Sequence, residues 1–208
     1  MYTGERFNTY SHLSGLILAA AGLALMLLKT IGHGDGYRIF SVSVYGISLL
    51  LLYLSSSLYH GIAAGKLKSI LKKTDHCMIY VLIAGSYTPF ALVSLRNGPG
   101  WTVFSLSWLL AAAGIAQELT IGRKSEKRLL SIAIYIVMGW MVLAVMKSLT
   151  ASLPPAGLAW LAAGGMLYSV GIYWFVNDEK IRHEHGIWHL FVLGGSITQF
   201  VSVYGYVI

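Results

Sequence analysis

The chain has 208 residues, of which 56% are hydrophobic and only 11% are charged, and its mean hydropathy is +0.68. Soluble domains carry about 25% charged residues, so this composition excludes an ordinary soluble protein and indicates an integral membrane protein. The net charge of +7 would suit nucleic-acid binding in a soluble chain. In a membrane protein, basic loops are instead expected to face the cytoplasm and anionic headgroups. We therefore expect membrane lipids, and no nucleic acid, as partners.

Seven apolar stretches are long enough to cross a bilayer as helices, which takes roughly 17–25 residues. In chain order they cover about 12–32, 38–60, 76–95, 101–119, 129–147, 156–176 and 186–207. The gaps between them hold charged residues or helix breakers, and the first stretch is too long for the core of a cleavable signal peptide. The pattern predicts an all-α fold, a bundle of seven transmembrane helices in which residues 1–208 form a single domain.

Three further residue types refine this prediction. Glycines inside the spans should let neighbouring helices approach closely. Pro89, in the third span, should kink that helix. The single cysteine, Cys77, excludes an intramolecular disulfide and a cysteine-cluster metal site.

The distribution of Lys and Arg predicts the orientation of the bundle. With the N-terminus in the cytoplasm and the C-terminus outside, eleven of the fifteen basic residues fall on the cytoplasmic side. These are Arg6, Lys66, Lys68, Lys72, Lys73, Arg123, Lys124, Lys127, Arg128, Lys180 and Arg182. The remaining four are Lys29, Arg38, Arg96 and Lys147. A count of six or eight spans would move a basic loop outside and is disfavoured.

Polar residues gather at the span ends that this orientation places in the cytoplasm. The second span ends in LSSSLYH, where Ser56 lies one helical turn from His60. The third begins after KKTDH, which contains Asp75, and the last opens with HGIWH, where His185 and His189 lie one turn apart. Residues four apart share one helix face and are separated by about 6 Å along the axis.

These residues are candidates for a metal site. Ionisable side chains in spans usually face the bundle interior, so two helices could present His60, His185 and His189 to one point. Neutral imidazoles suit zinc, and three histidines with an open fourth position are typical of catalytic zinc. Asp75 could then hold a water molecule or orient a ligand, and Ser56 could bind a ligand or a substrate oxygen. The alternative is a solvated polar face at the membrane interface.

The other histidines are assigned plainer roles. His76 directly follows Asp75, and adjacent helical residues do not face each other, so His76 is expected to be a hydrogen-bonding residue at a helix interface. His33 falls in a loop on the opposite side, and His183 precedes the last span, where we expect it to be solvated.

The combination of SSLYH, Asp75 fifteen residues after His60, and HGIWH closely resembles the hemolysin III family. That family is the bacterial branch of the progestin and adipoQ receptors and is related to alkaline ceramidases; ERFNTYSHLSG and GSYTPF resemble it too. The resemblance implies a multi-pass protein of the bacterial cell membrane with a buried zinc near its cytoplasmic side. The family's motif residues correspond to Ser56, His60, Asp75, His185 and His189. Its N-terminal polar residues correspond to Glu5, Asn8 and His12, which either touch the site or cap the first helix at the interface.

Several functions remain open at this level. The leading hypothesis is a zinc-dependent hydrolase of a lipid amide or ester, with Asp75 and Ser56 as catalytic residues. The second is a sensor or regulator of lipid state in which the metal clamps helices together. Cytolysis, which the family name suggests, fits poorly with seven strongly apolar spans, because a secreted pore-former must first be soluble. A transporter would be expected to show charged residues at mid-membrane, where Gln199 is the main polar residue. The substrate and the oligomeric state are left undetermined.

Overall fold

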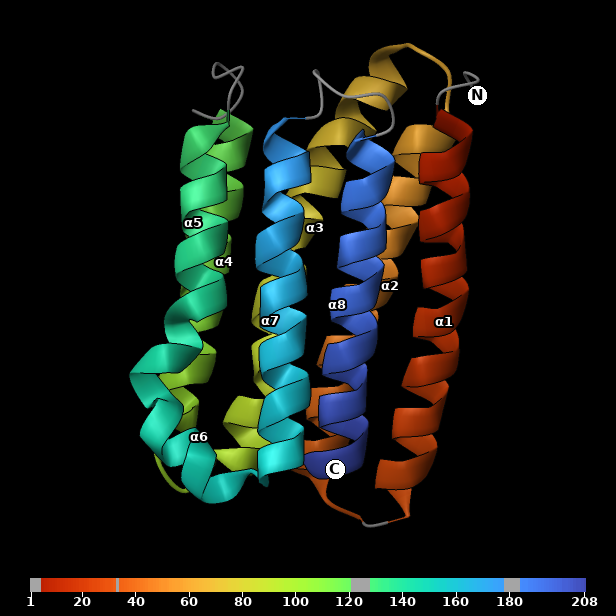
Figure 1. Cartoon of the computed structure of the whole chain (residues 1–208). Helices are drawn as coiled ribbons and strands as arrows, with labels where there is room; N and C mark the ends of the chain where they lie inside the picture. The colour runs from red at the N-terminus through yellow and green to blue at the C-terminus, as the bar shows by residue number, and fades with distance from the viewer. Residues whose placement is uncertain (1–4, 33, 121–127, 178–183) are drawn as a thin grey trace.

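The computed structural model describes residues 5–32, 34–120, 128–177 and 184–208, and these residues are almost entirely helical (Figure 1). The long helices are α1 (Arg6–Ile31), α2 (Gly36–Gly61), α3 (Lys66–Pro89), α4 (Gly100–Thr120), α5 (Leu129–Trp140), α7 (Pro155–Val176) and α8 (Glu184–Tyr206). A π-helical segment (Phe90–Ser94) extends α3, and a 3₁₀ segment (Met141–Val145) joins α5 to α6 (Met146–Ser152). Within the described residues, seven helical segments are long and apolar enough to span a membrane, as predicted.

The helices run side by side along one direction, and the two termini lie at opposite ends of the bundle (Figure 1). Helix α2 packs against both α1 and α3, α8 packs against α7 and α1, and α3 also packs against α4. Helix α5 makes much sparser contact with α7. We call the end that holds the start of α1, the end of α2 and the start of α8 the N-terminal end. The distribution of basic residues predicts that this end is cytoplasmic; Arg123, Lys124, Lys127, Lys180 and Arg182 lie outside the described residues.

Two helices begin earlier than the hydropathy pattern predicts. Helix α1 starts at Arg6, and α3 starts at Lys66, ten residues before the predicted apolar span. The added turns of α3 have the sequence KLKSILKK, whose lysines and leucines favour a helix wherever their charges are solvated. Hydropathy detects the part of a helix that sits in lipid, so it missed these polar turns.

The kink predicted at Pro89 takes the form of a change in helix type. Pro89 is the last residue of α3, and the backbone continues as the π-helical segment Phe90–Ser94. Proline lacks an N–H and crowds the carbonyl of the preceding turn, and a wider helical turn relieves that conflict. The fifth span, predicted as one helix, is divided in the structure into α5, the 3₁₀ segment and α6.

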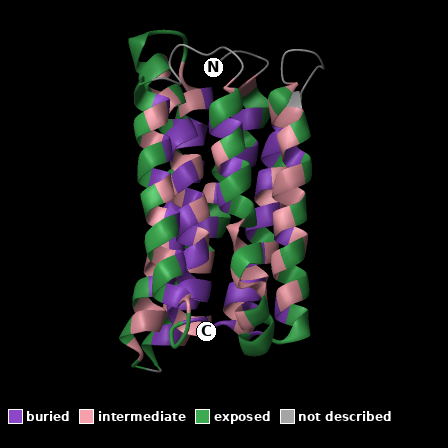
Figure 2. Cartoon of the chain, turned by 90° about the vertical axis from the view of Figure 1, so that its left-hand side faces the viewer, coloured by how far each residue is buried: buried purple, intermediate pink, exposed green. Residues whose placement is uncertain are grey.

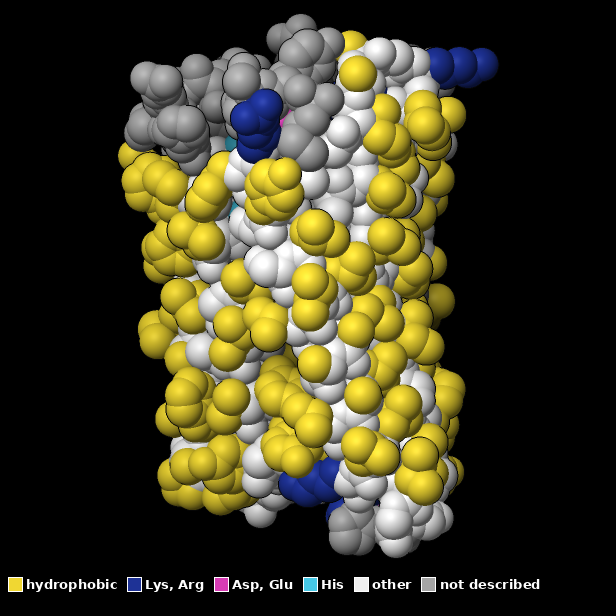
Figure 3. Space-filling model, turned by 90° about the vertical axis from the view of Figure 1, so that its right-hand side faces the viewer, with side chains coloured by type: hydrophobic (Ala, Val, Ile, Leu, Met, Phe, Trp, Pro, Cys, Tyr) yellow, Lys and Arg dark blue, Asp and Glu magenta, His cyan; other side chains and the backbone are white. Residues whose placement is uncertain are grey.

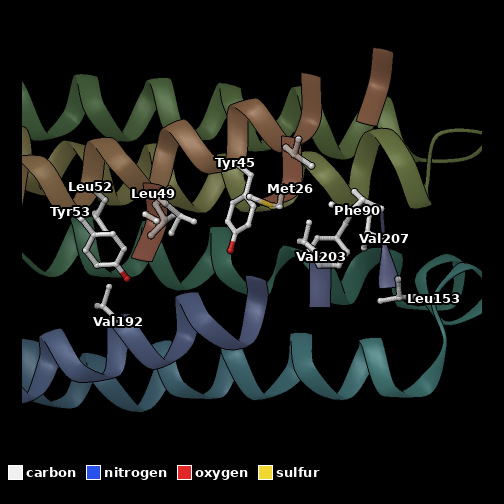
Figure 4. Packing of buried hydrophobic residues seen from close by; sticks show 14 of the residues in the cluster. Met26, Tyr45, Leu49, Leu52, Tyr53, Phe90, Leu153, Val192, Val203 and Val207 are labelled. Atoms are coloured by element: carbon white, nitrogen blue, oxygen red, sulfur yellow. The ribbon is translucent and has the colours of Figure 1, made fainter. Parts of the chain in front are cut away.

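The core lies between α1, α2, α3 and α8, while exposed residues cover the outside of the bundle (Figure 2). Tyr45 and Tyr53 extend from α2 toward α8 and are fully buried (Figure 4). The Tyr53 hydroxyl donates to Ser196 Oγ at 2.8 Å, and Tyr168 Oη lies 2.9 Å from the same oxygen. These bonds satisfy phenol groups that would otherwise be unpaired in an apolar core. They hold α8 in register with α2 and α7.

The outer surface is a continuous apolar band with Lys and Arg side chains only near its two ends in the face seen in Figure 3. This distribution matches a bilayer, which accepts apolar side chains along its hydrocarbon depth and charges at its interfaces. Glycines inside the spans do mark close approaches, as expected. A Cβ on Gly85 of α3 would collide with the Ser48 side chain of α2, and one on Gly164 of α7 would lie 2.7 Å from Gln199 Cγ of α8.

Candidate metal centre and cavity

Three histidines meet at the N-terminal end of the bundle. His60 lies in the last turn of α2, and His185 and His189 lie in the first two turns of α8. One ring nitrogen of each lies within 4.8 Å of those of the other two, and Nε2 of His60 is 3.1 Å from Nε2 of His185. His60 and His189 are almost completely buried. The triad could therefore hold a metal ion, and the convergence predicted from the sequence is confirmed.

In His60 and His189, hydrogen-bond acceptors contact the Nδ1 atom and so orient the ring. Nδ1 of His60 contacts the Glu5 carboxylate, and Nδ1 of His189 lies 3.1 Å from the Asn8 carbonyl oxygen and 3.1 Å from Ser11 Oγ. An Nδ1–H that donates to these oxygens leaves the lone pair of Nε2 to bind a ligand. Metal-binding histidines are typically oriented in this way by a carboxylate or a backbone carbonyl. The donor set of this chain thus fits a metal ion.

The N-terminal polar residues touch the site, which resolves the alternative left open by the sequence. The His12 ring stacks on the His189 ring at a centroid distance of 3.5 Å, and Asn8 Nδ2 donates to Glu5 at 3.3 Å. Glu5 is the residue before α1, but its side chain forms no capping hydrogen bond. The hydrogen bond with His60, reinforced by Lys68 3.5 Å away, lowers the pKa of Glu5 to about 2 despite its partial burial. Glu5 is therefore a carboxylate partner of His60.

Ser56 and Asp75 lie at the same end of the bundle. Both are buried, and both line the cavity that His185 and His189 also line. Ser56 lies beside the Asp75 carboxyl, and its Oγ has no hydrogen-bond partner among the described residues. The arrangement leaves a hydroxyl and a carboxyl next to the triad, where a ligand could meet them.

His76 belongs to a different polar cluster, between α3, α4 and α5, that the sequence analysis missed. Nδ1 of His76 lies 3.7 Å from Oε1 of the buried Glu118, which also accepts hydrogen bonds from Arg128 and, at 2.7 Å, from Ser131 Oγ. His76 is thus an interface residue, as predicted. The available signal was the acidic residue inside the fourth span, because a carboxylate there needs a partner. His33 and His183 lie outside the described residues.

A cavity of about 560 Å³ extends from the triad along the bundle between α3, α5, α7 and α8. His12, Ser56 and Asp75 line one end, Gln199 lines a deeper part, and the wall between them is mostly apolar. Ile136 of α5 and Met166 of α7 line the cavity, and both side chains are exposed. These two residues come from helices α5 and α7, which contact each other only sparsely.

In the part of the chain that the structure describes, seven helices long and apolar enough to cross a membrane, a buried histidine triad and an apolar cavity define a multi-pass membrane protein with a candidate metal centre. The family model described as Haemolysin-III related matches residues 1–200. The chain is 41% identical to Hemolysin-3 of Bacillus cereus over 98% of its length and 92% of that protein. It is 42% identical to the Hemolysin-3 homolog of Bacillus subtilis (strain 168) over 97% and 93%, respectively. It is also 29% identical to the human monocyte to macrophage differentiation factor over 96% and 82%.

The chain therefore belongs to the haemolysin-III related family, and it is a multi-pass membrane protein of the bacterial type. The resemblance inferred from SSLYH, Asp75 and HGIWH is confirmed across essentially the whole chain.

Proposed function

We propose that this protein is a zinc-dependent hydrolase that cleaves the amide or ester bond of a membrane lipid. The observation that carries the proposal is the cavity, which is apolar along most of its wall and is lined at one end by Asp75, Ser56 and two histidines of the triad. A lipid has the same division into a long apolar chain and one polar group. Binding sites of this kind are mostly apolar, with a few convergent polar groups that fix the orientation of the ligand.

The polar residues at this end have separable roles. Zinc held by His60, His185 and His189 would supply a Lewis acid that polarises a carbonyl and lowers the pKa of a water molecule. Asp75 accepts a proton from water as the water oxygen bonds to the acyl carbon, and it returns that proton to the leaving nitrogen or oxygen as the scissile bond breaks. Ser56 donates a hydrogen bond to the substrate carbonyl oxygen. Its buried and unpartnered Oγ, next to Asp75, supports this role.

The substrate reaches this site from the bilayer. Ile136 of α5 and Met166 of α7 line the cavity, are exposed, and belong to helices that contact each other sparsely, which supports entry of an acyl chain between α5 and α7. The apolar wall then excludes bulk water from the chain, while the polar group stays beside Asp75 and Ser56.

The test begins with elemental analysis of the detergent-purified protein beside His60→Ala and His189→Ala. We expect about one zinc per chain in the wild type and its loss in both variants. A panel of lipid amides and esters is then incubated with wild type and Asp75→Asn, and released fatty acid is measured. Turnover by wild type, abolished in Asp75→Asn while zinc is retained, supports the proposal. A folded wild type without metal, or with zinc but inactive on the whole panel, contradicts it.

A second candidate function is a lipid sensor in which the metal clamps helices together. It is favoured by the way the triad joins α2 to α8, while Glu5 and, from α1, Asn8 and Ser11 contact two of the same histidines. Metal binding then contributes directly to folding, so His189→Ala should lower the melting temperature sharply. An unchanged melting temperature in the metal-free variant would rule out the clamp.

A further inference from the structure

Gln199 is a buried polar residue in the deep part of the cavity that the proposed chemistry does not use. Its side chain lines the cavity, only 9% of the residue is exposed, and its Oε1 is shielded from solvent. This oxygen finds no hydrogen-bond partner among the described residues. Buried polar groups in folded proteins are almost always paired, so an unpaired amide oxygen on a residue that lines a cavity points to a partner that enters the cavity.

The neighbouring polar groups do not supply that partner. Tyr168 and Ser196, which lie between Gln199 and the histidines, bond to each other at 2.9 Å. The absence of a side chain at Gly164 of α7 leaves room for the Gln199 side chain, because a Cβ on Gly164 would lie 2.7 Å from Gln199 Cγ. The Gln199 side chain thus packs against α7, and Gln199 shares the cavity wall with apolar residues such as Val192.

The position of Gln199 on α8 fixes its distance from the site. His185, Val192 and Gln199 are spaced by seven residues, or about two helical turns, so they share the face of α8 that lines the cavity. Gln199 follows His189 by ten residues, which corresponds to about 15 Å along the axis. A single extended chain that lies along this face, with its polar group at the triad, passes both residues.

We propose that Gln199 determines specificity for a lipid whose chain carries a hydroxyl about 15 Å from its polar group. An extended hydrocarbon chain built from bonds of about 1.5 Å advances roughly 1.3 Å per bond, so the hydroxyl lies about a dozen carbons along the chain. The hydroxyl donates to Gln199 Oε1 and can accept from its Nε2. This inference rests on the proposed function for the placement of the polar group, but it concerns binding and needs no turnover.

The test compares two fatty acids that differ by one hydroxyl, stearate and 12-hydroxystearate, as competitors of a fluorescent fatty acid bound to the purified protein. One neutral hydrogen bond in a buried site predicts that wild type binds 12-hydroxystearate about three- to tenfold more tightly than stearate. Gln199→Leu and Gln199→Met should reduce that ratio to about one by removing the amide. The control is Thr198→Val, since Thr198 bonds to the Gly194 carbonyl oxygen at 3.0 Å and does not line the cavity.

Each outcome bears on the inference. A ratio near one in wild type, or the same preference in Gln199→Leu as in wild type, would overturn it, and so would failure of both fatty acids to bind. A preference that Thr198→Val keeps and both Gln199 variants lose would support it. Because the measurement is of binding, absence of hydrolysis would refute the proposed function and leave the role of Gln199 standing.

Discussion

The contact between Glu5 and His60 predicts that a residue outside the triad controls its metal affinity. In Glu5→Gln the amide oxygen can still accept from His60 Nδ1, but the negative charge that strengthens the imidazole as a ligand is lost. Removing such a partner typically weakens metal binding about 10- to 100-fold, which corresponds to roughly 1.4–2.7 kcal/mol. The Glu5 side chain is 25% exposed and water screens part of its charge, so we expect the lower end, about tenfold.

The assay is competition for zinc between the purified protein and a chelator of known affinity, with wild type and variant measured side by side. Asp35→Asn provides the matched control, because Asp35 is a carboxylate at the opposite end of the bundle whose side chain accepts from the Tyr37 N–H. We expect its zinc affinity to equal that of wild type. Zinc affinity in Glu5→Gln within about twofold of wild type would refute the role of Glu5 as a partner of His60.

Two further predictions concern stability, each measured by unfolding in mixed micelles. Glu118→Gln should lower the free energy of unfolding by about 3 kcal/mol, because it removes one partner of a buried ion pair and leaves the charge of Arg128 uncompensated. A decrease below about 1 kcal/mol would mean that water solvates the pair. Gly85→Ala should lower the free energy of unfolding by about 1–3 kcal/mol, because the added Cβ would collide with the Ser48 side chain. Gly139→Ala should leave stability unchanged or raise it, because no atom lies within 4 Å of a Cβ at that position. Equal effects of the two alanines would contradict the close helix approach at Gly85.

The architecture could be predicted because a bilayer imposes strong rules on a sequence. Each crossing needs a long apolar helix, and charges collect at its ends, so hydropathy and basic residues together predict the spans. The same rules explain the errors. The lysine-rich first turns of α3 lie where a helix no longer contacts hydrocarbon, and the 3₁₀ segment inside the fifth span leaves hydropathy unchanged.

The candidate site was predicted from helical periodicity. His185 and His189 are one turn apart, and the topology places His60 at the same end of the bundle, so their meeting follows from spacing and from the parity of the spans. The sequence spacing of the histidines does not predict which residues contact the Nδ1 atom or the face of each imidazole ring. The contact of Glu5 with His60 and the stacking of His12 on His189 depend on how α1 packs against α2 and α8.

The sequence by itself determined that this is a seven-helix membrane protein with histidines gathered at one end, because apolar length and helical period are local properties of the chain. Only the tertiary structure decided which residues surround the histidines, how Glu118 is paired, and that Gln199 faces a cavity. Those features arise from side chains of helices distant in sequence. Which faces of those helices meet is set by small residues such as Gly85 and Gly164 acting together, and no single segment carries that information.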